Sequence, residues 1–346
     1  MKKNIIFTLL IMLAASLAHA QEQAVANGNG FGGLIEKSNG SMVNWADGFI
    51  SASSEIKLLP DSIDPVRSKA LAVRQGGVES RKALLDVVLG LSVDGKSKVS
   101  ALLKDDLKSL NLLRGYVQNS LFSTAMTNGT VSVTSSLNLR NGLSSIIIPP
   151  TISFQTGIPP TISGERGEAG VELQALESGE NGFADSTAYS GIVIDGRGLP
   201  FTPVLLPLIY DGKGVGVYGT FAVSRESVVK RGLVAYMVDS KSENLRARVG
   251  NFPLTVKAVN SQGPSRSNFI LSIDDAVKVR AVLKRRTVIE NCAVVVLVDG
   301  PLAKTEAEGD IESLTPEQQP ETAVESESGI QEDSLDETPK VDNQQR

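Results

Sequence analysis

The stretch from Tyr189 to Asp299 is framed by two strongly apolar segments, and this frame constrains the fold more than any other feature of the chain. The first segment, Gly191 to Ile194, runs into the turn residues Asp195-Gly-Arg-Gly198, and the second is Cys292 to Val298. Short apolar runs bounded by turn residues are typical of buried strands. Residues 187–300 are therefore predicted to form one α+β domain with a strand at each end.

Between these two segments, strand-like runs alternate with one clear helix. Asp274-Asp275 opens the helix, whose apolar stripe of Ala276, Val279 and Val282 has the spacing of a helix that is buried on one side. The strand-like runs are Val204 to Tyr210, Gly216 to Val223, Val234 to Val238, 251–257 and Phe269 to Ile273. Because a tight turn at Asp211-Gly212 returns the chain, we expect a largely antiparallel sheet.

A second pattern predicts another small α+β domain over residues 41–145. The strand-like run Met42 to Ala52 precedes Asp64-Pro65, which is an N-cap followed by a first-turn proline. Gly76-Gly77 inside the following helix indicates close packing against a sheet, since each glycine costs about 1 kcal/mol relative to alanine. The apolar stripe of this helix consists of Ala70, Val73, Gly77, Leu84, Val88 and Leu91.

The rest of this first domain is expected to be a short helix and a hairpin. The helix covers Val99 to Leu112, and the strands Leu113 to Ala125 and Thr130 to Leu139 flank Thr127-Asn-Gly129, a strong hairpin signal. This order of elements places the long helix on one face of a sheet. The predicted fold class is therefore α+β, with two small domains that are each a largely antiparallel sheet packed with helices.

The remaining segments are expected to lie outside the two domains. Residues 1–20 have the pattern of a signal peptide, and Gln21 stands where a lipoprotein would have its lipidated cysteine. Residues 21–40 are predicted to be a flexible leader, and residues 146–186, in which Pro-Pro-Thr-Ile-Ser occurs twice, a semi-rigid linker. The composition of residues 301–346 predicts a disordered tail. We expect a cleaved, periplasmic protein with no transmembrane segment in its mature chain.

The charged residues are distributed unevenly along the chain. The tail, residues 301–346, holds 3 basic and 13 acidic residues, whereas residues 21–300 hold 29 basic and 26 acidic residues. A weakly basic body with an acidic tail favours a homo-oligomer whose electrostatic contacts salt would weaken. A sheet edge in the hairpin Leu113 to Leu139 is the first candidate for the main association surface. No nucleic-acid partner is expected.

The composition excludes several kinds of catalytic site. The one histidine, His19, leaves with the signal peptide, which removes histidine-dependent catalytic arrangements and zinc sites that rely on imidazole. The one cysteine, Cys292, lies in an apolar run and is predicted to be a buried, inert thiol. No catalytic, cofactor-binding or metal-binding residue is predicted, and no cofactor is expected.

Several short motifs match catalytic or binding patterns, and a structural interpretation is favoured for each. Gly28-x-Gly30-x-x-Gly33 has no preceding strand, and Gly214-x-Gly216-x-x-Gly219 is followed by a strand-like run, so neither predicts a dinucleotide site. Ser54-x-x-Lys57 and Ser227-x-x-Lys230 lack the other elements of penicillin-recognising enzymes.

Two charged groups leave a binding role open. The basic residues from Lys278 to Arg286 could face an anionic surface, although the solvated side of an amphipathic helix is the favoured interpretation. Asp195, Arg197 and Asp211 could form a polar cluster where strands meet, and turn stabilisation explains them equally well.

Two stretches resemble one bacterial envelope family, the Lpp20-like lipoproteins that include the flagellar protein FlgP. The first contains Trp45-Ala-Asp-Gly-Phe-Ile-Ser-Ala52, the helix through Arg81 to Asp94, and Gly129-Thr-Val-Ser-Val133. The second contains Tyr189-Ser-Gly-Ile-Val-Ile-Asp-Gly-Arg-Gly-Leu199 and Val217-Tyr-Gly219. The resemblance implies a noncatalytic envelope or flagellar accessory role, although the missing cysteine excludes the lipid anchor of that family.

The sequence therefore predicts a noncatalytic exported envelope protein that acts through protein–protein contacts, with other envelope or flagellar proteins as partners. A flagellar or outer-membrane assembly factor is the most specific form of this hypothesis, and association with the outer membrane is its alternative location. Two other classes stay open: a periplasmic cell-wall or glycan hydrolase or transferase that uses carboxylates, and a periplasmic ligand-binding module.

Overall fold

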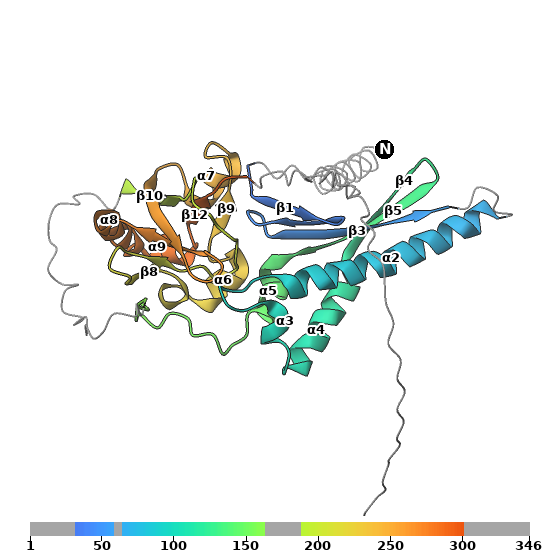
Figure 1. The fold of residues 1–346 in the computed structure, drawn as a ribbon, viewed down its shortest axis with the longest axis horizontal. Coiled ribbons are helices and arrows are strands. Elements are labelled where there is room, and N and C mark those ends of the chain that lie inside the picture. Colours follow the sequence, from blue (N-terminus) through green and yellow to red (C-terminus); the bar gives the residue numbers. More distant parts are fainter. Residues whose placement is uncertain (1–31, 59–63, 163–187, 301–346) are drawn as a thin grey trace, which may run out of the picture. The chain divides into compact units, whose positions relative to one another are not determined.

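The computed structural model describes residues 32–58, 64–162 and 188–300. They form an α+β fold, as the sequence predicts. It has one five-stranded and one seven-stranded sheet, within a compact unit that ends at Ala303 (Figure 1). The predicted signal peptide and acidic tail lie outside the described residues. Within the described ranges, no helix is long and apolar enough to cross a membrane.

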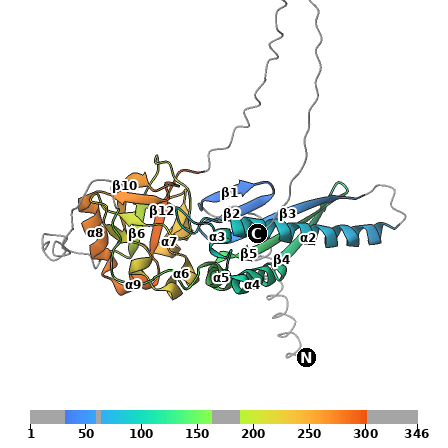
Figure 2. The ribbon, with the colours of Figure 1, turned by 60° about the horizontal axis from the view of Figure 1, so that its bottom comes forward.

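The first sheet is antiparallel, and its strand order is β1-β2-β3-β5-β4. Helix α2 lies along one face of this sheet, over β3 and β5, in both views of the ribbon (Figures 1 and 2). The strands are β1 (Ile35–Ser38), β2 (Ser41–Asn44), β3 (Phe49–Lys57), β4 (Leu121–Thr127) and β5 (Thr130–Asn138). The helices are α2 (Pro65–Gly90), α3 (Val99–Leu102), α4 (Leu107–Gln118) and α5 (Ser144–Ile147), and a kinked turn with non-helical backbone angles at Arg140 and Asn141 covers Leu139–Leu143.

Helix α2 begins where the sequence predicts. The Asp64 carboxylate accepts a hydrogen bond of 3.0 Å from the backbone N–H of Arg67, and Pro65 occupies the first turn. The buried face differs from the predicted stripe in its first half, where Ala70 is exposed and Ala72 is buried. From Ala72 onward, small residues lie against the sheet at intervals of four, and the larger Leu84 and Val88 follow.

The two adjacent glycines of α2 have different surroundings, and we expect opposite effects when each is replaced by alanine. A Cβ on Gly76 would lie 2.6 Å from Cγ2 of Val133, whereas a Cβ on Gly77 would meet only the Arg81 guanidinium, at 3.6 Å. Gly76→Ala should destabilise the protein by about 1–3 kcal/mol through overpacking, and Gly77→Ala should stabilise it by up to about 1 kcal/mol through helix propensity. Urea denaturation of both variants measures the difference, and equal shifts would contradict the assigned packing.

The predicted hairpin is confirmed, but its first strand begins later than expected. Asn128 and Gly129 have φ values of 49° and 74°, as the twist-matched two-residue hairpin turn requires. The expected strand Leu113 to Ala125 is wrong over its first half, because Leu113 and Val117 form the buried face of α4. The expected helix Val99 to Leu112 is divided into α3 and α4, since Asp106 accepts a hydrogen bond from the backbone of Ser109 and starts a new helix.

The end of the predicted flexible leader is structured. β1 pairs with β2 through a turn at Asn39 and Gly40, both of which have positive φ. Leu34 is 4% exposed, and its backbone N–H donates a 3.0 Å hydrogen bond to the carbonyl of Tyr236. The expected single strand Met42 to Ala52 is divided between β2 and β3 by a turn that contains Trp45. The leader is thus part of the fold from Gly32 onward, because Leu34 is buried and β1 is paired with β2.

The second sheet is mixed rather than largely antiparallel. Its strand order is β8-β7-β11-β10-β6-β12-β9, and four of its six pairings are parallel. The strands are β6 (Gly191–Asp195), β7 (Ile209–Tyr210), β8 (Gly216–Tyr218), β9 (Ala235–Met237), β10 (Pro253–Gln262), β11 (Asn268–Leu271) and β12 (Val294–Leu297). Its helices are α6 (Arg225–Arg231), α7 (Glu243–Val249), α8 (Ile273–Leu283) and α9 (Arg286–Glu290), with a 3-10 turn at Thr220–Ala222. Parallel strands require crossover connections, and the short helices supply them.

The end of the described part of the predicted linker, residues 155–162, is hydrogen-bonded to the segment that contains β8. Backbone hydrogen bonds join Gly157 to Phe221, at 3.0 Å, and Gly216 to Pro160, at 2.8 Å. Buried residues of both sheets, among them Trp45 and Tyr236, belong to one continuous hydrophobic core. The predicted boundaries at 41–145, 146–186 and 187–300 stay predictions.

Candidate interaction surface

β4 is an open edge of the first sheet. Among the described residues it pairs only with β5, on one side, and all seven of its residues are exposed. The strand reads Leu-Phe-Ser-Thr-Ala-Met-Thr and has no charged residue, proline or glycine. Natural sheets protect their exposed edges with charges, proline, bulges or short strands. β4 has none of these protections and presents unpaired backbone donors and acceptors along its length.

The other sheet edges in the described part of the chain are short or occupied. β1 has four residues, and two of them, Glu36 and Lys37, are charged. At the edges of the second sheet, β9 is bridged by Gly33, and β8 is preceded by Val215, which is bridged by Thr161. β4 is therefore the one long strand that these surroundings leave open.

Large apolar side chains on β4 extend beyond the cover of α2. Phe122 and Met126 are 52% and 53% exposed. They lie on the α2 side of the sheet, because Phe122 is opposite Ser135 of β5, whose hydroxyl makes a 2.7 Å hydrogen bond with that of Ser80 on α2. The Arg81 guanidinium lies 5.3 Å from the centroid of the Phe122 ring, within cation–π range. An apolar strip thus lies beside α2 on the edge strand.

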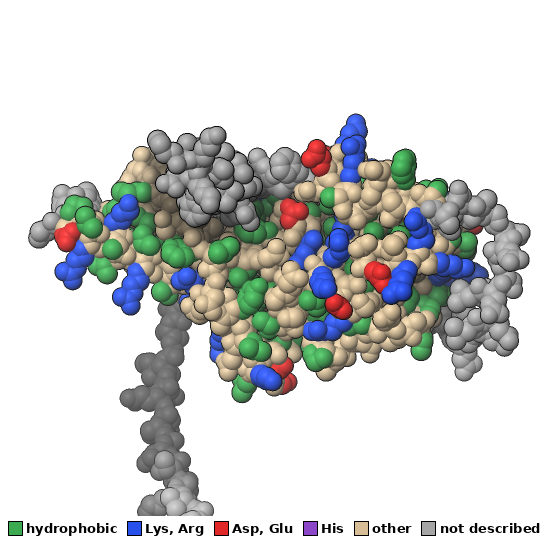
Figure 3. All heavy atoms as spheres, turned by 180° about the vertical axis from the view of Figure 1, so that it is seen from behind, with side chains coloured by type: hydrophobic (Ala, Val, Ile, Leu, Met, Phe, Trp, Pro, Cys, Tyr) green, Lys and Arg blue, Asp and Glu red, His purple; other side chains and the backbone are tan. Residues whose placement is uncertain are grey.

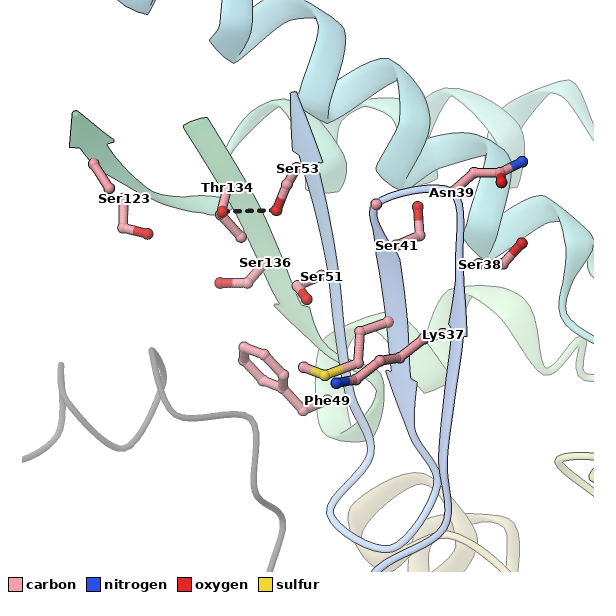
Figure 4. A pocket seen from close by; sticks show the side chains of 13 residues that line it. Lys37, Ser38, Asn39, Ser41, Phe49, Ser51, Ser53, Ser123, Thr134 and Ser136 are labelled. Carbon is pink, nitrogen blue, oxygen red and sulfur yellow. Dashed lines mark hydrogen bonds between the residues drawn. The ribbon is translucent and has the colours of Figure 1, made fainter. Parts of the chain in front are cut away.

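The opposite face of the sheet carries a shallow groove of about 630 Å³ that is lined with hydroxyl groups (Figure 4). The hydroxyl groups of Ser53 and Thr134 are hydrogen-bonded at 2.8 Å, and Ser123 extends the lining onto β4. Phe49 and Lys37 lie at one end. The described residues that line it include no carboxylate, and most of them offer hydroxyl groups for hydrogen bonding.

Of the three residues of the predicted polar cluster, Asp195 and Arg197 pair with each other, whereas Asp211 has other partners. Asp195 forms an ion pair with Arg197 at 2.6 Å, and hydrogen bonding from Arg197 lowers the pKa of the Asp195 carboxyl group. Asp211 instead forms an ion pair with Arg280 at 2.7 Å and accepts two backbone hydrogen bonds in its own turn. Asp299 accepts a 2.6 Å hydrogen bond from the backbone of Gly198. These contacts support the turn-stabilising interpretation.

The basic residues of α8 and α9 make contacts within the protein. Lys278 pairs with Asp275 at 2.9 Å, Arg280 with Asp211 at 2.7 Å, and Arg286 with Glu290 at 2.6 Å. On the face in Figure 3, Lys and Arg side chains are spread over the surface and Asp and Glu side chains are fewer. On this face the positive charge is therefore distributed over the surface.

The serine–lysine and second glycine motifs have structural roles. The hydroxyl of Ser54 donates to Glu79 at 2.6 Å, and Lys230 pairs with Glu226 at 2.7 Å. Gly214 lies in the turn between β7 and β8 with a φ of 78°, and no phosphate-binding helix begins there. The contacts of these motifs do not form the serine–lysine hydrogen bond of a catalytic pair.

Cys292 is fully buried, as the sequence predicts. Burial raises the pKa of its thiol, which disfavours the nucleophilic thiolate. Among the residues that the structure describes, no group of three or more His, Cys, Asp or Glu side chains is placed to hold a metal ion.

A comparison with protein families matches residues 191–300 to the second domain of Treponema pallidum Tp0624. The match extends from the start of β6 to three residues beyond β12, so it covers all seven strands of the second sheet and none of the first. The resemblance to the Lpp20-like and FlgP lipoproteins is wrong, since this family is the one found over the second stretch and no Lpp20-like model matches. The search of curated proteins gave no match. Sharing small residues, glycines and turn motifs was insufficient to identify the family.

Proposed function

We propose that this chain is a noncatalytic, exported envelope protein that acts through protein–protein contacts, and that β4 is the strand to which a partner adds its own. The observation on which this proposal rests is the edge strand of the first sheet, whose seven residues are all exposed and uncharged. An added strand would form main-chain hydrogen bonds with β4, and side chains on both faces would supply specificity. Export rests on the N-terminal signal pattern.

The surroundings of β4 support a binding role. Phe122 and Met126 provide apolar contact area on one face, and the hydroxyl groups of the groove provide hydrogen-bonding positions on the other. The polar residues of the candidate catalytic motifs are engaged in turns, caps and ion pairs. An interaction surface is therefore the role that the geometry supports best.

Site-specific photo-cross-linking tests this proposal in cells that export the protein. A photoreactive phenylalanine analogue at Met126 should give adducts of defined mass, because a partner strand would lie against this position. The matched control is the same analogue at Phe252, which is 72% exposed and directly precedes β10 of the second sheet. If the adducts at position 126 were no more abundant than those at position 252, β4 would not be the contact surface.

A further inference from the structure

We infer that the partner of β4 is β4 of a second copy of this chain, paired antiparallel about a two-fold axis at Thr124. This inference rests on the proposed function of β4 as a contact strand and specifies its partner. It follows from the self-complementarity of the strand, from the position of α2, and from the state of the other sheet edges.

The strand matches itself in one register. With Thr124 opposite the partner's Thr124, Phe122 lies opposite the partner's Met126, and Ser123 lies opposite the partner's Ala125. Aromatic–thioether contacts and threonine pairs across strands are favourable, and no like charges meet because β4 carries none. All seven residues are used in this register. Moving its centre to Ser123 places Phe122 opposite threonine and shortens the paired segment.

The position of α2 leaves room for a second sheet. A two-fold axis perpendicular to the sheet keeps the same face of both copies on the same side, since paired residues across antiparallel strands point the same way. α2 packs on β3 and β5, so Phe122 and Met126 of both copies would lie between the two α2 helices. Arg81 already lies over the Phe122 ring and constrains its position. The apolar strip of each copy would thereby be covered by the other.

The opposite face would become continuous across the seam. Ser123 and Ala125 line the hydroxyl groove at the β4 edge. On this face, Ser123 of each copy would lie opposite Ala125 of the other copy. The result is a ten-stranded sheet with a shared groove on its helix-free side. Because the seam contains backbone hydrogen bonds and uncharged side chains, its stability should depend little on salt.

A disulfide placed at the axis tests the register in the mature, full-length chain. Thr124→Cys should form a covalent dimer under mild oxidation, since directly opposed strand residues lie within the reach of a disulfide. Thr127→Cys is the matched control, because the two copies of this position would be roughly 20 Å apart along the strands. Cys292 is buried and does not compete. Equal yields from the two variants would exclude pairing centred on Thr124.

Light scattering tests whether association depends on β4. The native protein should be a dimer at micromolar concentration at both low and high salt. Ala125→Lys, which places two lysines near the centre of the seam, should be monomeric, whereas Ala125→Thr should remain dimeric. Circular dichroism checks that each variant is folded. A native protein that stays monomeric at every concentration would overturn self-pairing. Cross-linked adducts at position 126 with the mass of a different protein would then still support the proposed function. If no such adducts formed either, both the self-pairing and the proposed function of β4 would be excluded.

Discussion

Replacing Trp45 with alanine is expected to lower the free energy of unfolding by about 3–5 kcal/mol, among the largest effects of a single substitution in this protein. Trp45 is 7% exposed and belongs to the hydrophobic core that both sheets share. Its ring meets that of Tyr236 in β9 edge to face, with centroids 6.0 Å apart and planes at 86°. The indole N–H donates a 2.8 Å hydrogen bond to Glu36.

Because these contacts join β1, the turn before β3 and β9, the loss should destabilise both sheets in one transition. Urea denaturation measures this loss of stability. Far-ultraviolet circular dichroism is used to follow unfolding, because the chain has a single tryptophan and the variant therefore has no indole fluorescence. Trp45→Phe is the matched control. It retains an aromatic ring against Tyr236, loses the hydrogen bond, and should cost less than alanine. Two separate transitions, with the alanine variant affecting one, would show that the sheets unfold independently.

Local signals predicted the elements that depend on local chemistry. Asp64-Pro65 located the start of α2, and Thr127-Asn-Gly129 located the turn of the β4–β5 hairpin, because caps and two-residue turns require particular side chains at fixed positions. The same reasoning applied to Asn39-Gly40 would have found the β1–β2 hairpin. The polar composition of the leader concealed that signal, since a four-residue strand adds few apolar residues to the average.

The short helices that connect strands of the second sheet were also missed, because their sequence patterns are weak. α6 and α7 have seven residues each, begin after Ser224 and Ser242, and end before Gly232 and Gly250. Serine before a helix and glycine after it are standard boundaries, but seven residues span two turns and give little periodicity. Without these crossovers, the sequence favoured hairpins between neighbouring strands. The parallel pairings therefore appeared only in the structure.

The sequence predicted where the open sheet edge lies, but it did not predict that the large side chains of β4 are exposed. The sequence indicated a sheet edge within Leu113 to Leu139, yet the alternation of Phe122, Thr124 and Met126 is also the pattern of a strand with one face in the core. What leaves these side chains exposed is that α2 covers two neighbouring strands and stops short of β4. The width of a helix relative to a sheet is a property of the assembled fold, which periodicity does not encode.

The second large effect is expected from Asp211→Ala, which should lower the free energy of unfolding by about 3–5 kcal/mol, as is typical when one partner of a buried ion pair is removed. Asp211 is 5% exposed. One oxygen of its carboxylate accepts hydrogen bonds of 2.9 Å from the backbone N–H groups of Lys213 and Val215, and the other accepts 2.7 Å from the guanidinium of Arg280. Alanine would leave three donors without this acceptor.

A matched set of variants separates the turn from the ion pair. Asp211→Asn retains an oxygen for the two backbone donors and loses the charge, so we expect it to cost roughly half as much as alanine, near the 1.5–3 kcal/mol of a hydrogen bond to a charged group. Urea denaturation at neutral pH gives each value. If asparagine were as destabilising as alanine, the charge on Asp211 would account for the whole effect and the turn for none.

The cost of the alanine variant should also depend on the guanidinium that it leaves behind. The Arg280 side chain is 24% exposed, and besides Asp211 it contacts the carbonyl of Gly216 at 3.3 Å. Adding Arg280→Met removes the unpaired charge while retaining apolar volume on α8, so the double variant should be more stable than Asp211→Ala alone. If the effects of the two substitutions on the free energy of unfolding were simply additive, the Arg280 guanidinium would be adequately solvated without Asp211. The stabilisation by Asp211 would then come from its hydrogen bonds in the β7–β8 turn and not from its ion pair with α8.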